Sequence, residues 1–248
     1  MCELYLSSAA RPHFPAADLA HLQRHGGSPW TNLQGWGAAW LEDDATRTRL
    51  LKHPLPARGA ADYGGLLREA PLSPVWLTHL RAASTGGVSL HNTQPFCFGW
   101  PDHENEACAF MHNGELKGMD ARIIEQFGED PRDGGTDSEG AKIILHEALE
   151  AAEDIDAAWG VFGHVVQDLR AMGIANFIVA LGADVFVHAH RRTQVGESVA
   201  DDTALFMGQS EGRLRLSSEP FASDDTPVRR GQLLWIRDGA VRARGMTY

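Results

Sequence analysis

The sequence predicts an α+β domain in which two mostly antiparallel sheets pack face to face with helices on the outside. Three observations indicate this four-layer αββα arrangement. Strand-like segments lie at both ends of the 248-residue chain, two amphipathic helices lie between them, and the last third alternates apolar and polar residues as strands do. Helices and strands do not alternate regularly, which argues against a doubly wound parallel sheet. No segment resembles a linker, so we expect a single domain over residues 1–248.

The first half of the chain contains strands separated by short helices. We predict strands over residues 2–7, 35–41 and 75–81, where apolar and strand-forming residues dominate. We predict a helix over 18–25 because Gly26-Gly27 follows it as a stop, and a second over 62–70 before Pro71. Residues 45–52 show no clear pattern.

The middle of the chain holds a strand and two helices. A strand over 107–111 is followed by His112-Asn113-Gly114, and Asn-Gly is a strong turn dipeptide, so we expect a turn there. Thr136 and Glu139 fit a capping box that opens a helix. A further helix is predicted over 158–172, where apolar residues recur at three- and four-residue steps before Gly173.

Paired strands are predicted for the last third. Residues 177–181 and 185–190 flank a Gly-containing turn, and 232–236 and 240–243 flank Asp238-Gly239, so both pairs suggest hairpins. Residues 214–218 form a further predicted strand. Together with the strand at the N-terminus, these segments supply the two sheets.

Composition narrows the class of function. The net charge is −11 with no basic run, which argues against binding to nucleic acid or to an anionic membrane. The three cysteines lack the spacing of a metal site, and no segment resembles a signal peptide or a membrane span. We therefore expect a soluble, reduced, cytoplasmic protein without a metal or cofactor.

Cys2 is the first candidate for catalysis. An aminopeptidase removes Met1 when a small residue follows it, which would leave a thiol and a free α-amine on Cys2. The amine titrates near ~7.7–8.0 and the thiol near ~8.5, so the amine can act as the base for its own thiol. Taken alone, Cys2 is better interpreted as a leftover cysteine at a frayed terminus.

Six motifs in chain order make the catalytic interpretation of Cys2 more specific. They are Met1-Cys2-Glu3-Leu4, Gly35-Trp36-Gly37, Arg81 before a Gly-rich turn, Asn92-Thr93-Gln94-Pro95-Phe96, Phe110-Met111-His112-Asn113-Gly114 and Gly135-Thr136-Asp137-Ser138-Glu139. This set resembles the class II glutamine amidotransferases, which are N-terminal-nucleophile (Ntn) hydrolases, and in particular their stand-alone, YafJ-type members. The resemblance covers nearly the whole chain and implies the Ntn-hydrolase form of the αββα sandwich.

The resemblance also implies roles for individual residues. Asn113 and Gly114 match the donors that stabilise the oxyanion of the tetrahedral intermediate. Arg81 matches the residue that binds the α-carboxylate of glutamine, and a planar guanidinium suits that task. Asp137 matches the acid that binds the α-ammonium. His112 and Trp36, from the same motifs, are expected at the substrate. The alternatives are a surface arginine, a structural Asn-Gly turn and a helix-capping aspartate.

Two positions depart from the family pattern. Gln94 stands where relatives have a histidine, and Gln34 stands where they have an aspartate. An amide exchanges hydrogen bonds but does not titrate near neutral pH. Since the expected base is the α-amine, we interpret Gln94 as a change in substrate contacts. His188 and His190, which would share one face of a strand, lack further metal ligands.

The sequence thus predicts an amidohydrolase that cleaves the γ-amide of glutamine, or of a γ-glutamyl amide, through a thioester on Cys2. A separate synthase that accepts the ammonia is a further expected partner. The alternative is a non-catalytic module that binds glutamine or γ-glutamyl compounds, or a regulatory partner.

Overall fold

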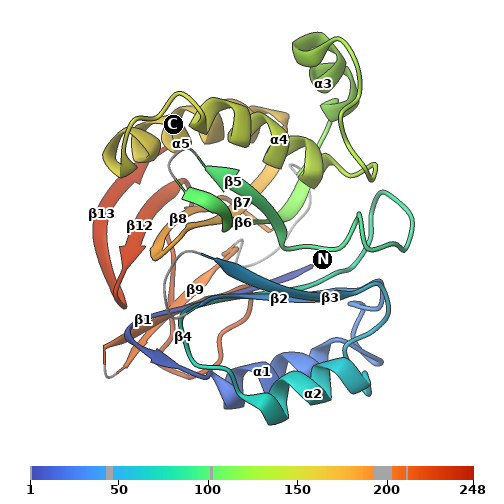
Figure 1. Ribbon diagram of the computed structural model, residues 1–248, viewed down its shortest axis with the longest axis vertical. Helices are drawn as coiled ribbons and strands as arrows, with labels where there is room; N and C mark the ends of the chain where they lie inside the picture. The colour runs from blue at the N-terminus through green and yellow to red at the C-terminus, as the bar shows by residue number, and fades with distance from the viewer. Residues whose placement is uncertain (1, 43–46, 101–102, 193–202, 211) are drawn as a thin grey trace.

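Two sheets lie face to face between two layers of helices (Figure 1). The structure is a computed structural model that describes residues 2–42, 47–100, 103–192, 203–210 and 212–248. Every pair of neighbouring strands within these residues is antiparallel. The predicted αββα architecture is confirmed.

The first sheet, sheet A, contains the N-terminal strand near its centre. Its seven strands, in spatial order, are β11 (Thr226–Pro227), β9 (Phe206–Ser210), β10 (Arg213–Ser217), β1 (Glu3–His13), β4 (Ser73–Leu80), β2 (Trp36–Leu41) and β3 (Thr48–His53). Residues 3–9 of β1 are all buried, as expected for a strand that has a neighbour on each side and a packed layer on each face.

The second sheet, sheet B, is formed mainly by the second half of the chain. Its six strands, in spatial order, are β13 (Ala240–Met246), β12 (Gln232–Arg237), β8 (Asp184–Ala189), β7 (Gly173–Leu181), β6 (His103–Leu116) and β5 (Phe96–Trp100). The two predicted hairpins are confirmed as β7–β8 and β12–β13.

Helices cover the outer face of each sheet. α1 (Ala16–His25) and α2 (Ala61–Glu69) pack on sheet A, and α4 (Asp137–Leu149) and α5 (Ile155–Leu169) pack on sheet B. A 3₁₀ turn, η1 (Arg170–Met172), follows α5, and α3 (Met119–Phe127) projects at one end of the outer layer (Figure 1). The four helices predicted from spacing and stop signals are present.

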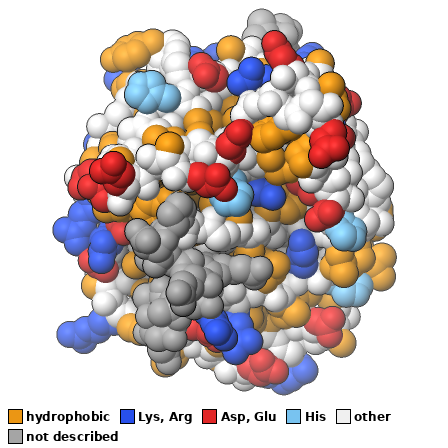
Figure 2. All heavy atoms as spheres, turned by 45° about the horizontal axis from the view of Figure 1, so that its top comes forward, with side chains coloured by type: hydrophobic (Ala, Val, Ile, Leu, Met, Phe, Trp, Pro, Cys, Tyr) orange, Lys and Arg blue, Asp and Glu red, His pale blue; other side chains and the backbone are white. Residues whose placement is uncertain are grey.

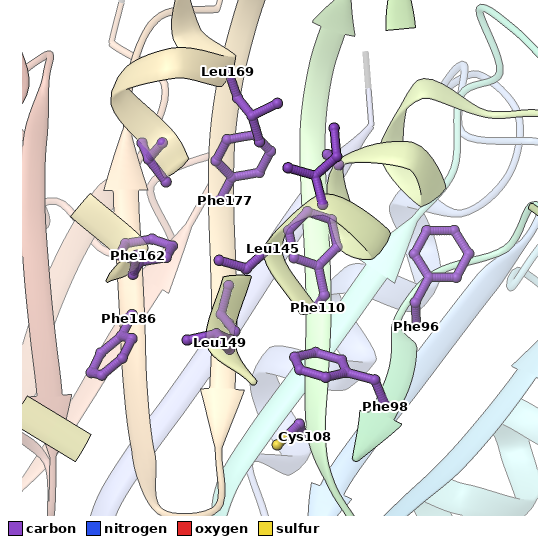
Figure 3. Close-up of a cluster of buried hydrophobic side chains, with 14 of the residues drawn as sticks. Phe96, Phe98, Cys108, Phe110, Leu145, Leu149, Phe162, Leu169, Phe177 and Phe186 are labelled. Carbon is purple, nitrogen blue, oxygen red and sulfur yellow. The ribbon is translucent and has the colours of Figure 1, made fainter. Parts of the chain in front are cut away.

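Three apolar layers hold the sandwich together. The strand alternation of β1 distributes its side chains between two of them: Leu4 and Leu6 face sheet B, whereas Tyr5 faces α1 and α2. The third layer lies between sheet B and its helices, where Phe110, Phe177, Phe186 and Phe162 come together (Figure 3). The N-terminal strand β1 is therefore packed on both of its faces, against sheet B on one and against α1 and α2 on the other.

One turn prediction was wrong. Residues 112–114 do not turn but continue β6, with Asn113 opposite Asn176 and Gly114 opposite Ala175 of β7. The glycine serves a different purpose, since a Cβ at Gly114 would lie 2.0 Å from the carbonyl oxygen of Ile174. Gly114 thus permits a close approach of two strands, and Asn-Gly is extended here because pairing with β7 overrides its local preference.

Other differences are smaller. The strand predicted to end at residue 7 continues to His13, β3 begins within the segment that showed no pattern, and neither β5 nor α3 was predicted. The capping box is half formed. Thr136 Oγ1 accepts the N–H of Glu139 at 3.2 Å, but the Glu139 carboxylate accepts the N–H groups of Asp133 and Gly134 instead of that of Thr136.

Phe162 provides a test of the layer between sheet B and α5. Its ring is fully buried beside Trp159 and Phe186. We expect Phe162→Ala to lower the free energy of unfolding by about 3–5 kcal/mol, because a large cavity replaces the ring. Urea denaturation measures this loss, with Ile124→Ala at an exposed position of α3 as the control. Equal losses in the two variants would contradict the packing described here.

Candidate active site

Cys2 lies immediately before β1, at the end of sheet A where β4 ends. Its Sγ accepts the N–H of Ala82 at 3.3 Å and lies 3.5 Å from the Ala82 carbonyl oxygen. The side chain is half-buried. Burial raises the pKa of the Cys2 thiol, while the hydrogen bond from Ala82 and the charge of Arg81 act in the opposite direction. The thiol therefore needs a nearby base to become a nucleophile at neutral pH.

Asn113 brings sheet B to the same point. Its side-chain Nδ2 donates to the carbonyl oxygen of Cys2 at 2.7 Å and lies 3.4 Å from Ser218 Oγ. Ser218 Oγ accepts the N–H of Leu4 at 2.9 Å, so this serine joins the start of β1 to Asn113. Asn176 in turn donates to the Asn113 carbonyl at 2.8 Å. Cys2 and Asn113 are 111 residues apart in sequence, but they are direct neighbours in the structure.

The side chain of Gln94 is hydrogen-bonded to the backbone of His112. The Gln94 amide accepts the His112 N–H at 2.6 Å and donates to the His112 carbonyl at 3.1 Å. The imidazole Nε2 faces the carbonyl of Ile174 at 2.9 Å and must donate, so Nδ1 accepts from Ser138 Oγ at 2.9 Å. Burial lowers the pKa of His112. Both side chains hold the strand that carries Asn113, and their contact with substrate stays a prediction.

Arg81 is buried at the end of β4, beside Cys2. Its guanidinium donates to the carbonyl oxygens of Thr85 at 2.8 Å and Gly87 at 3.0 Å, with longer contacts to Gly86 and Gln34. Burial lowers the pKa of Arg81, and the Cys2 side chain opposes this shift. The guanidinium is therefore near the thiol, and a substrate carboxylate would compete with carbonyl oxygens of the Gly-rich loop for it.

Asp137 begins α4 and lies close to the same site. Its Oδ2 accepts the N–H of Leu116 at 2.7 Å, which ties the helix N-terminus to the end of β6. Its negative charge raises the pKa of both Cys2 and His112, so the carboxylate is electrostatically coupled to both. Asn92 links the loop after β4 to the loop before α4, because its side chain donates to the Gly87 carbonyl and accepts the N–H of Gly135.

Trp36 lies elsewhere. Its ring packs at 4.7 Å against Tyr63 in the layer between sheet A and α2, and it is fully buried. The structure thus brings together Cys2, Asn113, Gly114, Arg81, Asp137, His112 and Gln94, but places Trp36 on the helix side of sheet A. Ser218, which sequence motifs did not assign to the site, joins the group because β10 pairs with β1.

The predicted site residues converge at Cys2 and lie away from a groove on the outer helix layer. A groove of about 480 Å³ lies on the outer helix layer among α3, α4 and α5, and none of the predicted site residues contributes to it. Among the residues that the structure describes, no group of three His, Cys, Asp and Glu side chains is arranged to hold a metal ion. Within the same residues, no helix is long and apolar enough to cross a membrane.

Comparison with known proteins agrees with this geometry. The family model of class II glutamine amidotransferases matches residues 1–247. A predicted glutamine amidotransferase of Escherichia coli (strain K12), YafJ, is 28% identical over 194 residues, which cover 76% of this chain and 72% of YafJ. The chain therefore belongs to the class II glutamine amidotransferases.

Solved structures show the same fold at lower identity. A predicted glutamine amidotransferase from Pseudomonas aeruginosa superposes with a TM-score of 0.62 at 20% identity, covering 98% of this chain and 100% of that one. The phosphoribosylpyrophosphate amidotransferase of Bacillus subtilis gives a TM-score of 0.70 at 16% identity and covers 99% of this chain. The chain spans only 49% of the Bacillus enzyme, and the likeness shows the Ntn-hydrolase fold alone.

A buried histidine beneath the site makes stability depend on pH. His79 of β4 is fully buried, and neither ring nitrogen has a partner among the described residues. Burial, with the charges of Arg81 and His112, lowers its pKa to about 3. The unfolded chain binds a proton near pH ~6.5 that the folded chain does not, so stability falls as pH drops below that value, by up to ~1.4 kcal/mol per pH unit.

We expect His79→Leu to stabilise the protein at pH 7 by about 1 kcal/mol or more, because it removes two unpaired polar atoms. It should also flatten the loss of stability between pH 6.5 and pH 4. Urea denaturation at several pH values measures both effects relative to the unmodified protein. An unchanged pH slope would contradict the depressed pKa of His79.

Proposed function

We propose that this chain cleaves the γ-amide of glutamine, or of a γ-glutamyl amide, with Cys2 as the nucleophile. The observation that carries the proposal is the meeting of Cys2 with Asn113, whose Nδ2 lies 2.7 Å from the Cys2 carbonyl oxygen. Arg81 and Asp137, which would bind the two charged groups of a glutamyl moiety, act electrostatically on the same thiol. Membership of the family supports cleavage of a glutamine amide.

In the proposed mechanism, removal of Met1 exposes the α-amine of Cys2, which takes the thiol proton. Met1 itself lies outside the described residues. The thiolate attacks the γ-carbonyl carbon and forms a C–S bond, and the oxygen becomes an oxyanion. Asn113 Nδ2 and the Gly114 N–H would stabilise this charge. The C–N bond then breaks, and the α-ammonium gives its proton to the departing ammonia or amine.

Water completes the cycle in the same scheme. The neutral α-amine accepts a proton from water, which attacks the thioester and releases glutamate with the free thiol. Arg81 would hold the α-carboxylate of the substrate in place of the loop carbonyls it now contacts, and Asp137 would hold the α-ammonium. Gln94 and His112 would shape the surrounding pocket, whereas Trp36, packed against Tyr63 on the helix side of sheet A, would take no part in it.

The acceptor of the ammonia is part of the proposal. We propose that a separate synthase receives the ammonia, or that the protein simply hydrolyses a γ-glutamyl conjugate. In either case the reaction would take place in a single domain of residues 1–248, in the cytoplasm. None of the three cysteines forms a disulfide, which supports a reducing compartment. On the face shown in Figure 2, acidic side chains are interspersed with basic ones, and the net charge is −11. This favours a small-molecule substrate over nucleic acid or a membrane.

A second candidate is a non-catalytic module that binds γ-glutamyl compounds. Two observations favour it: burial raises the pKa of Cys2, and the Arg81 guanidinium donates to loop carbonyls. Both would suit a site that binds but does not turn over. The next experiment separates the two candidates.

We expect Cys2→Ala to abolish release of ammonia from glutamine without unfolding the protein, since the half-buried thiol contributes little packing. The glutamine analogue 6-diazo-5-oxo-norleucine should form one adduct, on Cys2, as read by mass spectrometry. Cys97 and Cys108 serve as internal controls. Labelling of either one instead would contradict the assignment, and binding of glutamine without turnover would favour the non-catalytic module.

Asn113→Ala tests the oxyanion donor. We expect turnover to fall by roughly 10²–10³, with a smaller effect on KM, because the donor acts mainly in the transition state. Gly114→Ala would not serve the same purpose, because its Cβ would collide with the Ile174 carbonyl and disturb β6–β7 pairing. Equal losses in kcat and substrate affinity, or none, would mean that Asn113 is only structural.

A further inference from the structure

Glu3, the residue after Cys2, carries a buried carboxylate that the proposed reaction does not use. Its Oε2 lies 3.0 Å from Nδ1 of His25, and its Oε1 accepts Nδ2 of Asn32 at 2.7 Å. The side chains of Glu3 and His25 are only 6% and 9% exposed. The His25 ring is held in turn by Trp30, which stacks on it at 3.9 Å.

This arrangement is a poor way to gain stability alone. Burial raises the pKa of Glu3, and His25 opposes the shift. A buried charged group often contributes no more to folding than an apolar residue of similar size would, because the charge loses its hydration. The neighbouring layer around Tyr5, Leu19 and Leu22 is apolar and could accept such a residue. A role in fixing geometry accounts for the charged group better than a role in stability.

The partners of Glu3 lead along the chain to Arg81. Asn32 is two residues before Gln34, whose N–H donates to the Arg81 carbonyl at 3.1 Å, while the Arg81 N–H donates to Gly35 at 2.8 Å. The Gln34 side chain also accepts the N–H of Ala83 at 3.1 Å. Residues 32–35 therefore hold the backbone that continues β4 past its last residue.

That backbone is the one that touches the nucleophile. Ala82, between Arg81 and Ala83, donates its N–H to Cys2 Sγ at 3.3 Å. The contacts form a closed circuit: Cys2 is bonded to Glu3 in the chain, Glu3 reaches Asn32, the loop from Asn32 to Gly35 fixes residues 81–83, and Ala82 returns to the sulfur. Such a circuit sets the position of the thiol relative to the guanidinium of Arg81.

We propose that Glu3 is a positioning residue that, through Asn32 and His25, fixes the Cys2 thiol against the Ala82 peptide and beside Arg81. The inference rests on the proposed function in so far as it assigns the thiol a catalytic task. A displacement of about 1 Å at a reacting atom can lower a rate by about 10²-fold. Glu3→Gln keeps the shape of the side chain but removes the charge that His25 and Asn32 share.

The test compares Glu3→Gln, Asn32→Ala and the double variant, with Glu125→Gln on the exposed face of α3 as the matched control. Each single variant should lower kcat by about 10- to 10²-fold with a smaller change in KM. Since both act through one circuit, the double variant should be no slower than the worse single variant. The control should keep its activity. Asn32→Ala leaves residue 3 untouched, so it serves if Glu3→Gln fails to fold.

A second readout does not depend on turnover. The rate at which iodoacetamide alkylates Cys2 should rise roughly threefold or more in both single variants, because a loosened thiol is less desolvated. Cys97, on β5 and outside the circuit through Glu3 and Asn32, should react at an unchanged rate. If the unmodified protein releases no ammonia, the proposed function fails while the alkylation rates still decide the role of Glu3. Unchanged kcat and alkylation in folded variants, or losses equal to the loss of folded protein, would overturn the proposal.

Discussion

The antiparallel ladder of β1 with β4 and β10 is the interaction on which the candidate site depends. Leu6 of β1 lies opposite Leu77 of β4 on one side and Leu216 of β10 on the other. Residues 3–9 of β1 are all buried, and Glu3 pairs with Leu80 of β4, so the start of the strand is held on its β4 side. Cys2, directly before this strand, is thereby held beside the end of β4.

Two glycines allow close backbone approaches elsewhere in the two sheets. A Cβ at Gly37 would lie 2.2 Å from the carbonyl oxygen of Gln94, and one at Gly114 would lie 2.0 Å from that of Ile174. At Gly37, strand β2 comes close to the segment that holds His112 in place. At Gly114, β6 comes close to β7. Both are positions where backbone meets backbone, so side-chain chemistry would not have revealed their purpose.

The sequence predicted the αββα sandwich, both C-terminal hairpins and the residues that gather at Cys2, because these depend on local pattern or on motifs. It failed where distant pairing decides. Asn113-Gly114 has a turn signal, yet β7 extends it, and Thr48–His53 gains its strand form only from β2. The contacts of Ser218 with Leu4 and of Glu3 with Asn32 join segments whose sequences do not indicate that they meet. Trp36 shared a motif with Gly37 but packs on the opposite side of the sheet from the thiol.

The pairing of β1 with β10 also governs when the protein can acquire its structure. Tyr5 pairs with Ser217, so the first strand completes its edge only after more than two hundred further residues have left the ribosome. At the usual synthesis rate of about 5–20 residues per second, the N-terminal strand waits for at least about ten seconds with one edge unsatisfied. Contacts of such long sequence separation also slow the folding reaction itself. A nascent chain of this kind exposes an apolar strand edge to chaperones throughout most of its synthesis, and the surroundings of Cys2 are assembled among the last parts of the molecule.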